Sequence, residues 1–312
     1  MAVISNTYTT YDAIGLREDL SDVIDNIAPT ETRFLSALKK VKVKARNFDW
    51  LVDTLDSAAN NAQIEGNDVT FSAITPPVRW SNYAQISSKQ FLISRTENIV
   101  DKAGRDKEMD YQTVLKIKAM KRDANFALIR NTTFNAGATG TARQTRGLAG
   151  WITQGKVGAG AGAFPIPSSN TAPVAGTGYA FDESTLKTMI SAAYNAGGQS
   201  WTLYVRPADK VLASAFTGNA TRYQNVAENS GKLVAAYDVY VSDFGAIKIV
   251  PERQCDAAAY LIDHDHVSFA ELDGVNRSPL AKTGDAEKMM ITWEYGLKMD
   301  SKDAHAQARD LT

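Results

Sequence analysis

The chain has very few of the side chains that build disulfides and metal clusters. One cysteine, Cys255, and three histidines occur among its 312 residues. A single cysteine excludes an intramolecular disulfide, and it excludes thiolate clusters of the zinc-finger kind. With so few histidines and cysteines, no Ser-His-Asp or Cys-His constellation stands out. We therefore expect a protein that is not an enzyme and that carries no cofactor.

The sequence also lacks an excess of charge and a long apolar run. Lysine and arginine number 34 against 35 aspartates and glutamates, for a formal net charge of -1. This balance argues against a dedicated nucleic-acid binder, and it does little to keep identical copies apart. No stretch approaches the ~18 apolar residues that span a bilayer, and the first residues do not form a signal peptide. We expect a soluble protein, made in the cytoplasm, that can self-associate.

The first forty residues predict an arm followed by two short helices. Residues 5–12 are polar and rich in Thr and Tyr, which indicates an extended arm. Apolar residues at helical spacing predict a helix over residues 16–27, which Pro29 ends. A second helix is predicted to begin at Thr30, and its apolar face comprises Phe34, Leu35 and Leu38.

Residues 41–93 have the composition of strands around a long polar loop. Apolar and polar residues alternate imperfectly over residues 41–55, and strand-like composition returns over residues 69–74 and 78–93. Between them, residues 57–68 are rich in Ala, Asn, Asp and Gly and lack periodicity, which predicts an exposed loop. The pattern predicts an extended hairpin. Because an isolated hairpin is poorly stable, we expect another surface, such as a neighbouring subunit, to cover it.

The clearest single element is a long helix over residues 104–131. This stretch has no Pro or Gly after its first residue, and helix formers dominate it. At 1.5 Å per residue, about 27 residues make a rod of ~40 Å, which we expect to be the spine of the subunit. Its predicted apolar face comprises Ile117, Met120, Ala124, Ala127 and Leu128.

The second half mixes strands and helices. Residues 132–180 are rich in Gly, Ala, Thr, Ser and Pro, which predicts a loop-dominated connection and a domain boundary. Asp182 is a good N-cap for a helix that ends near Asn195, and Pro207 opens a helix that ends near Phe216. Strands are predicted over residues 201–205, 239–241, 247–250, 260–272 and 289–299. Because no regular βαβ rhythm appears, the predicted fold class is α+β.

One segment nearly matches a phosphate-binding loop. Residues 150–157 read Gly-Trp-Ile-Thr-Gln-Gly-Lys-Val, with Gly155 and Lys156 at the critical positions. The motif needs Ser or Thr after the lysine to hold magnesium, and Val157 cannot do so. It also needs a helix afterwards, where Ala and Gly follow instead. We interpret the match as chance and keep a nucleotide-dependent enzyme as a weaker alternative.

Residues 263–266, Asp-His-Asp-His, are the one cluster with metal-ligand character. In a strand, the two histidines would share one face and the two aspartates the other. A zinc or manganese site needs a further ligand, and His305 lies far along the chain. We favour a polar, solvent-facing strand here, with a metal-dependent enzyme as the alternative. Asp53 and Asp56 lie in a predicted loop, where nothing would raise a carboxyl pKa for acid–base catalysis.

In the order of its elements, the chain resembles major capsid proteins of tailed double-stranded-DNA bacteriophages, which have the Hong Kong-97-like fold. The elements are an arm, short helices, a long two-stranded loop, a spine helix, a Gly-rich connection, a mixed lobe and returning strands. One departure is Arg33, where the resemblance leads us to expect proline. The stretches that resemble one subfamily of phage head proteins are residues 19–35, 48–55, 61–66, 103–108, 121–123 and 147–152.

The resemblance implies a role for each part of the chain. Residues 1–38 would form the N-terminal arm, and residues 39–95 the extended loop that overlaps an adjacent subunit. The peripheral domain would comprise residues 96–150 with 256–312, and residues 151–255 would form the axial domain. An encapsulin-like compartment, which shares the fold but encloses cargo protein, is the alternative.

The resemblance also implies partners. We expect hexamers and pentamers of a shell, a portal protein, separate scaffolding and decoration proteins, and non-specific contact with packaged double-stranded DNA. The expected location is the virion, after assembly in the host cytoplasm. Arg130, Arg143 and Arg146 flank the Gly-rich connection and could meet a neighbour or DNA, with a solvated loop as the alternative. The candidates for subunit contacts are Trp50, Asp53, Glu65, Asp68, Arg79, Arg105, Arg143 and Arg146.

Overall fold

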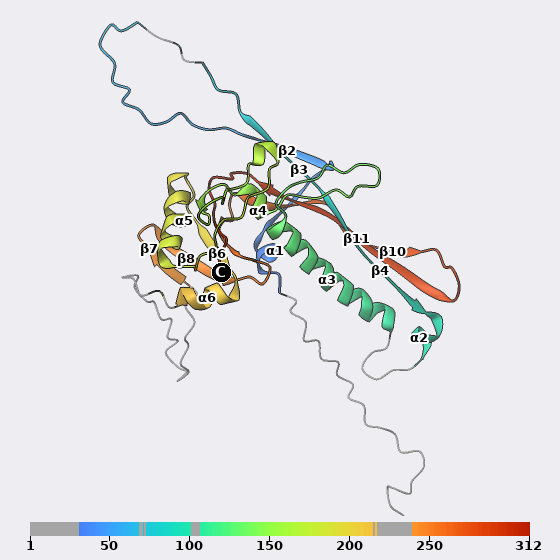
Figure 1. The fold of residues 1–312 in the computed structure, drawn as a ribbon. Helices are drawn as coiled ribbons and strands as arrows, with labels where there is room; N and C mark the ends of the chain where they lie inside the picture. Colours follow the sequence, from blue (N-terminus) through green and yellow to red (C-terminus); the bar gives the residue numbers. More distant parts are fainter. Residues whose placement is uncertain (1–30, 69–70, 72, 101–106, 215, 217–238) are drawn as a thin grey trace, which may run out of the picture.

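The computed structural model describes residues 31–68, 71, 73–100, 107–214, 216 and 239–312 (Figure 1). The predicted arm, the predicted helix over residues 16–27 and the contact candidate Arg105 lie outside them. No helix in the described part is both long enough and apolar enough to cross a bilayer. The short helix α1 (Arg33–Ala37) confirms the second predicted helix in a shorter form, with Phe34 fully buried.

One sheet of four strands runs the length of the subunit. Only β1 and β10 are parallel in it, and β11 pairs antiparallel with both β10 and β4. The predicted strand over residues 289–299 is confirmed within β11. The strand order is β1 (Lys39–Lys42), β10 (Val267–Leu280), β11 (Ala286–Met299) and β4 (Gln85–Ser94).

The long helix α3 (Glu108–Arg130) lies along this sheet and contacts β4 and β11 (Figure 1). It begins at Glu108 because Lys107 has an extended backbone, and its 23 residues span about 35 Å. Between sheet and helix lies one core cluster, which includes Phe269, Tyr295 and the aromatic residues of the hairpin. The spine helix is thus confirmed, and its buried side chains include the predicted Met120, Ala124, Ala127 and Leu128.

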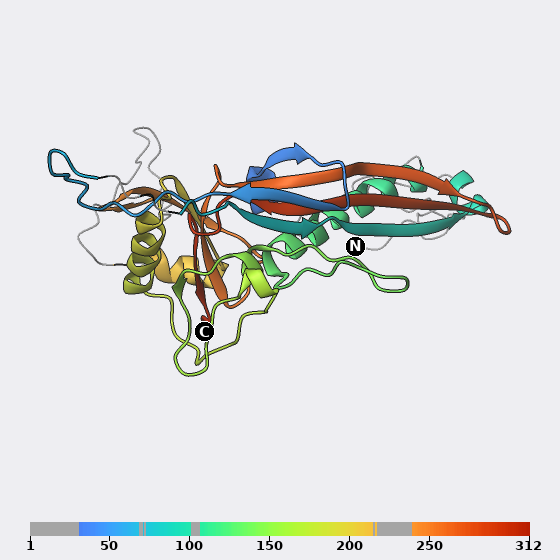
Figure 2. The same cartoon turned by 90° about the horizontal axis from the view of Figure 1, so that it is seen from above.

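A second sheet and core cluster form the other lobe, which carries α5 (Glu183–Asn195) and α6 (Pro207–Ser214). Seen from above, this lobe lies at one end of the molecule, and the long sheet with α3 extends from it (Figure 2). The strand order is β5 (Gly155–Lys156), β12 (Ala306–Arg309), β9 (Ala258–Asp263), β6 (Trp201–Val205), β8 (Gly245–Pro251) and β7 (Val239–Ser242).

Local signals account for the helices of this lobe. The Asp182 carboxylate accepts a hydrogen bond from the Thr185 N–H at 2.7 Å, which confirms the predicted N-cap of α5. At the other end, Gly197 has φ 94°, a left-handed conformation that suits a residue without a side chain. The predicted strands over residues 201–205, 239–241 and 247–250 are confirmed as well.

The connection between the lobes has little regular structure, as predicted. Between α3 and α5 it contains only α4 (Leu148–Trp151), β5 and the 3-10 helix η1 (Pro167–Ser169), together with isolated bridges. Gly147 and Gly150 of this connection approach the spine closely. A Cβ at Gly147 would lie 2.5 Å from the Leu128 carbonyl oxygen, and one at Gly150 would lie 2.0 Å from that of Thr132. Glycine is therefore required where the connection crosses the end of α3.

Three strand predictions are wrong in part. The predicted strand over residues 260–272 is two strands in different sheets, because a turn after Asp263 separates β9 from β10. Residues 78–93 divide into β3 (Val78–Tyr83), which pairs with β2 (Asn47–Val52), and β4, which pairs with β11. Ile74 and the other described residues of the stretch 69–74 have no regular secondary structure. The helix α2 (Arg95–Ile99) follows β4.

Candidate assembly surfaces

The root of the hairpin is a cluster of aromatic side chains. β2 and β3 are antiparallel, and their register pairs Trp50 with Trp80. Both rings contact Trp151 of α4, with centroid separations of 5.4 Å from Trp50 and 5.8 Å from Trp80. Phe48 stacks on Trp50 at 6.1 Å. Aromatic pairs contribute roughly 0.5–1.5 kcal/mol each beyond the area they bury, so the root is fixed to its own subunit.

This packing corrects the expectation that the hairpin lacks a covering surface in its own chain. Trp50 is only 8% exposed, and Phe48 is buried beside it. Trp50 was predicted as a subunit contact, but its ring faces the core of its own chain. The sequence could not show this, because Trp50, Trp80 and Trp151 lie far apart along the chain and only the fold brings them together.

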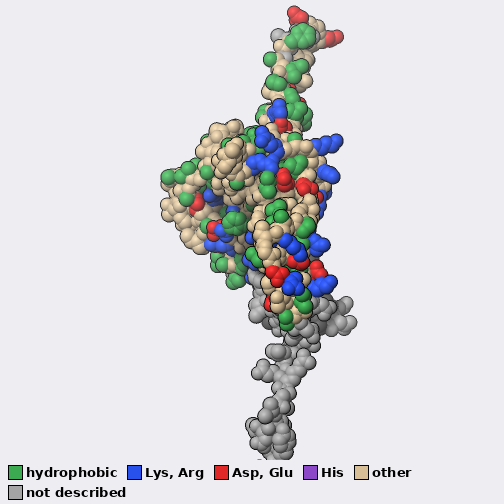
Figure 3. All heavy atoms as spheres, turned by 90° about the vertical axis from the view of Figure 1, so that its right-hand side faces the viewer, with side chains coloured by type: hydrophobic (Ala, Val, Ile, Leu, Met, Phe, Trp, Pro, Cys, Tyr) green, Lys and Arg blue, Asp and Glu red, His purple; other side chains and the backbone are tan. Residues whose placement is uncertain are grey.

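The loop that joins β2 to β3, residues 53–77, has the opposite character, and we call it the tip loop. All of its described residues are exposed and none forms a helix or strand, which confirms the loop predicted over residues 57–68. It extends beyond the body of the subunit, and hydrophobic and acidic side chains gather at its end (Figures 1 and 3). The exposed fractions of its large apolar side chains are 99% for Leu55, 80% for Ile64, 94% for Phe71 and 94% for Ile74.

The tip loop is acidic, whereas the segment that precedes the hairpin is basic. The tip loop contains Asp53, Asp56, Glu65 and Asp68 and no lysine or arginine. Residues 39–46, which we call the basic segment, contain five lysines and arginines and no acid, and all five side chains are exposed. Lys39 pairs with Asp265 at 2.7 Å, which raises the pKa of Lys39.

Two predicted contact residues make ion pairs inside the subunit. Arg79 of β3 pairs with Asp49 across the hairpin and keeps 70% of its side chain exposed. Arg143 of the connection pairs with Glu294 of β11 at 3.0 Å, with 16% of its side chain exposed. The Arg79 cation is well exposed and a surface pair adds little stability, so it remains available to a neighbour, whereas the Arg143 pair is largely covered by its own subunit. Contacts of Arg79, Arg143 and the tip-loop acids with another subunit stay a prediction.

Arg146, another predicted contact, lies in the interior. Its side chain is 1% exposed, and its guanidinium lies 4.9 Å from the ring centroid of Phe134 and 4.5 Å from that of Trp151. One amino group donates a hydrogen bond to Asn170 Oδ1 at 2.7 Å. Burial lowers the Arg146 pKa to about 10. The cation–π contacts of Arg146 thus hold the connection together, and its backbone N–H and C=O bond the Asn82 side chain of the hairpin. Arg146 therefore lies neither in a solvated loop nor on a surface that faces a neighbour.

The two segments with apparent chemistry have structural roles in the fold. Lys156 lies in β5, where its ammonium donates to Thr185 Oγ1 at 2.8 Å and lies 4.5 Å from the Tyr179 ring centroid. Residues 263–266 form the end of β9 and a turn, and not the polar strand that we favoured. The buried Asp263 carboxylate accepts the backbone N–H groups of Gln199 and Asp265, which holds this turn. Among the described residues, no three His, Cys, Asp or Glu side chains form a group that could hold a metal.

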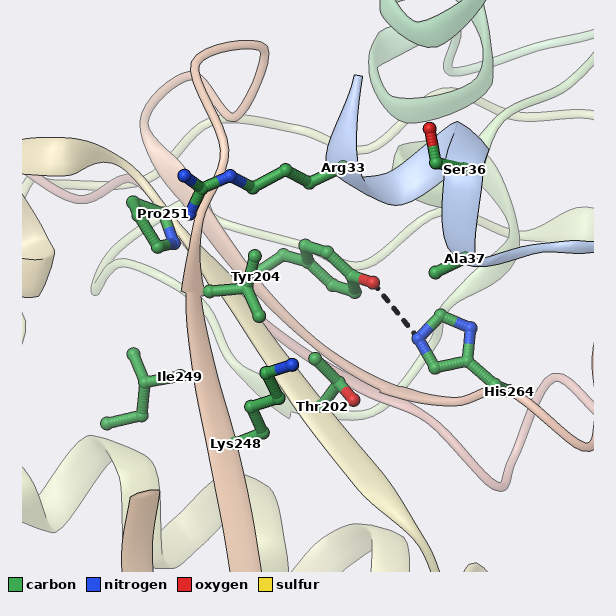
Figure 4. A pocket seen from close by; sticks show the side chains of 10 residues that line it. Arg33, Ser36, Ala37, Thr202, Tyr204, Lys248, Ile249, Pro251 and His264 are labelled. Atoms are coloured by element: carbon green, nitrogen blue, oxygen red, sulfur yellow. Dashed lines mark hydrogen bonds between the residues drawn. The ribbon is translucent and has the colours of Figure 1, made fainter. Parts of the chain in front are cut away.

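A pocket of about 600 Å³ separates α1 from β6 and β8, with His264 of the turn at one side (Figure 4). The Tyr204 hydroxyl and His264 Nε2 are hydrogen-bonded at 3.0 Å. Burial lowers the His264 pKa and raises the Tyr204 pKa, so both groups are neutral near pH 7. Phe34 packs against Tyr204 at 5.4 Å, edge to face. The pocket therefore lies where α1 docks onto the second lobe. The Tyr204 hydroxyl is the partner of His264 Nε2, whereas His264 Nδ1 is buried and has no hydrogen-bond partner among the described residues.

Comparisons with known proteins agree on one kind of protein. The family model of the SU10 major capsid protein matches residues 3–312. The major capsid protein of Escherichia phage Phieco32 is 26% identical over 328 residues, which cover 93% of each chain. The capsid of Cyanophage A-1(L) has a TM-score of 0.65 at 14% identity and covers 97% of this chain and 98% of its own. The SrpI encapsulin of Synechococcus elongatus PCC 7942 has a TM-score of 0.58 at 10% identity, with 96% of each chain covered.

The sequence prediction did not single out the run of exposed cations in the basic segment. Its signal was visible, because five cations within residues 39–46 contrast with four acids and no cation in the tip loop. At the same positions, Val41 and Val43 alternate with the lysines, and this alternation predicts a strand. The aromatic anchor on Trp151 was also missed, and no local signal could have identified its partners.

Proposed function

The chain belongs to the SU10 major capsid protein family, and from this premise we propose that it assembles into hexamers and pentamers of an icosahedral head. It is a structural protein of the virion of a tailed phage, with the Hong Kong-97-like fold. The family model favours the phage shell over the encapsulin-like compartment, which shares the fold.

The exposure of the tip loop supports this proposal most directly. Leu55, Phe71 and Ile74 are each more than nine-tenths exposed on one projecting loop. Fully burying a side chain of this size stabilises a structure by about 1.5–3 kcal/mol, and these side chains gain almost none of this stabilisation in the isolated subunit. A neighbouring copy that covers the loop would recover this energy at every contact of a closed ring. We infer that the tip loop is the principal intersubunit element.

The proposed parts of the subunit follow the predicted ranges. Residues 1–38 would be the arm, residues 39–95 the extended loop, and residues 96–150 with 256–312 the peripheral domain around α3 and the long sheet. Residues 151–255 would form the axial domain. The six-stranded sheet combines β5, β6, β7 and β8 from the axial range with β9 and β12 from the peripheral range, so the two domains would move as one body.

The proposed partners follow from the role of a head shell. A portal protein would occupy one vertex, scaffolding and decoration proteins would be separate chains, and packaged double-stranded DNA would touch the inner surface without sequence preference. Assembly would take place in the host cytoplasm. The formal net charge of -1 fits such an inner surface. A strongly basic surface would bind the DNA phosphates tightly, whereas a shell needs only to enclose the DNA.

Deletion of residues 57–68 tests the proposal. We expect the shortened chain to fold, because the deleted residues make no contact with the aromatic root. We also expect it to form no stable shells, whereas the intact chain forms shells, tubes or rings of five and six in negative-stain electron microscopy. A chain with a Gly-Ser segment of equal length in place of residues 57–68 is the control for loop length.

The deletion variant and the intact chain separate the possible failures. Shells of normal size from the deletion variant would contradict the role of the tip loop. An intact chain that stays monomeric at every concentration would contradict self-assembly itself.

A further inference from the structure

We propose that the basic segment of one subunit binds the tip loop of a second copy of the chain through their opposite charges. The basic segment is residues 39–46 and the tip loop is residues 53–77. This inference rests on the proposed function, since it names the surface that receives the loop when subunits assemble. It is carried by charged side chains that have no ion-pair partner among the described residues of their own subunit.

The unpaired charges fall on two segments and have opposite signs. Beyond Lys39, the cations of the basic segment make no ion pair with any described residue, and the acids of the tip loop make none either. All of them are exposed, so their charges are unopposed locally. The cations are Lys40, Lys42, Lys44 and Arg46, and the acids are Asp53, Asp56, Glu65 and Asp68.

The fold keeps the two segments of one subunit from neutralising each other. The aromatic root fixes β2 and β3, and the tip loop projects away from the body that carries the basic segment (Figure 1). Figure 3 shows red and green side chains at the end of the projection, whereas blue and red side chains both lie on the body below. We therefore expect the carboxylates that pair with the basic segment to come from the tip loop of another copy.

The sign of the charges also fixes the symmetry of the contact. Two acidic tip loops repel each other, and so do two basic segments, so a two-fold contact of like surfaces is disfavoured. A loop on one copy and a segment on the next form a head-to-tail contact, which generates a ring where the rotation from copy to copy closes. Apolar contact accompanies the charges, because Val41 in the basic segment is 39% exposed and the loop presents Leu55 and Ile74.

Protection of a sheet edge explains only part of the basic segment. β1 is the edge strand of the long sheet, and lysines on such strands prevent unwanted pairing with other chains. That account covers Lys39, Lys40 and Lys42. Lys44 and Arg46 lie beyond β1 and protect no strand edge, yet they continue the same run of charge.

Charge reversal on each side tests the inference in the full chain. One variant carries Lys40→Glu with Lys42→Glu, and the other carries Asp56→Lys with Glu65→Lys. Sedimentation velocity measures association of each variant, and circular dichroism confirms its fold. We expect each variant alone to associate about tenfold or more weakly than the natural chain. The first variant lowers the charge of the basic segment from +5 to +1, and the second changes the charge of the tip loop from -4 to 0, so most of the attraction between them is removed.

Mixing the two variants gives the decisive result. In a one-to-one mixture, the unsubstituted tip loop again meets the unsubstituted basic segment, and the introduced lysines meet the introduced glutamates in the other contact. Association of the mixture should therefore be clearly stronger than that of either variant alone. Rings with an even number of subunits should be favoured, because only these can alternate. A control variant, Lys118→Glu with Lys121→Glu, makes the same change in net charge on the exposed surface of α3 and should associate normally.

Three outcomes would overturn the inference. Normal association of the Lys40 and Lys42 variant would show that the basic segment is not the receiving surface. A mixture no stronger than its components would show that the two segments do not meet. Equal weakening of the α3 control would assign the effect to net charge and not to position. A natural chain that never associates would instead overturn the proposed function.

Discussion

The root and the tip of the same hairpin behave as opposite kinds of structure. At the root, Trp50 and Trp80 pack against Trp151 in the interior of their own subunit. At the tip, Leu55 and Ile74 are almost fully exposed and make no contact of this kind. The two regions are continuous in sequence and both contain large apolar side chains, so the presence of such side chains does not by itself distinguish root from tip.

The difference shows which apolar side chains are buried within one subunit and which need a second copy to cover them. The root contributes to folding of one chain, and its loss should unfold that chain. The tip makes no contact of this kind within one chain. We therefore expect its loss to leave the unfolding free energy unchanged and to weaken assembly. Substitutions can therefore be ordered by their effect on the free energy of unfolding of the isolated subunit.

The largest effect on unfolding is expected at the root. Trp151→Ala removes the ring that contacts Trp50, Trp80 and the Arg146 guanidinium, and leaves a large cavity. We expect the free energy of unfolding to fall by about 3–5 kcal/mol, measured by urea denaturation. A loss below about 1 kcal/mol would show that the root is not fixed in its own chain.

The next effect depends on pH and lies at a buried polar contact. His305 is fully buried, accepts the Asp263 N–H at its Nδ1 at 3.0 Å, and has its pKa lowered to about 4 by burial. Because the unfolded chain binds a proton near pH 6.5, the unfolding free energy should decrease as pH falls from about 6.5 to 4. The expected loss is about 3 kcal/mol.

His305→Asn is the matched variant for this prediction. The asparagine side-chain oxygen can still accept the Asp263 N–H, and it does not titrate in this range. Denaturation at pH 7.5 and 4.5 should therefore show a smaller loss for the variant than for the natural chain. Equal pH dependence of the two proteins would contradict a buried, neutral His305.

A smaller effect is expected at the N-terminus of α5, in the second lobe. Asp182→Ala removes the acceptor for the Thr185 N–H, which should cost about 1 kcal/mol of unfolding free energy. Asp182→Asn keeps a capping oxygen and should recover most of this loss. Failure of the asparagine variant to recover it would assign the effect to the nearby Lys156 ammonium, 4.0 Å from Asp182.

The smallest effect on folding is expected at the tip. Leu55→Ser with Ile74→Ser changes two exposed side chains, so the unfolding free energy should stay within about 0.5 kcal/mol of the natural value. Shell formation, followed by light scattering and electron microscopy, should nevertheless be lost or strongly reduced. A variant that unfolds more easily but assembles normally would invert the comparison between root and tip.

Local signals predicted the helices well. The apolar spacing of α3 and the capping residue of α5 depend on neighbours three or four positions away, so the sequence contains them directly. The exposed loop over residues 57–68 was equally visible, since it lacks any periodicity. The resemblance to phage head proteins added the order of these elements and hence the fold.

Long-range packing could not be predicted in the same way. The pairing of β4 with β11 joins residues about two hundred positions apart, and no local pattern at β4 distinguishes β11 from β3 as its partner. Likewise Arg146 has the sequence context of an exposed loop, and the rings of Phe134 and Trp151 together with the Asn170 side chain make its burial tolerable. These contacts became visible only once the fold had brought the residues together.

Zero-length crosslinking of an isotopically mixed assembly tests the central claim most directly. Equal amounts of unlabelled and fully ¹⁵N-labelled chain are assembled together and treated with a carbodiimide, which joins carboxylates to lysines in contact. Mass spectrometry then shows whether each linked pair of peptides comes from one chain or from two. We predict that tip-loop carboxylates such as Asp56 and Glu65 link to lysines in mixed-isotope pairs, with Lys40, Lys42 and Lys44 among them. Tip-loop links that join only peptides of the same isotope would place these contacts within one chain and contradict the account.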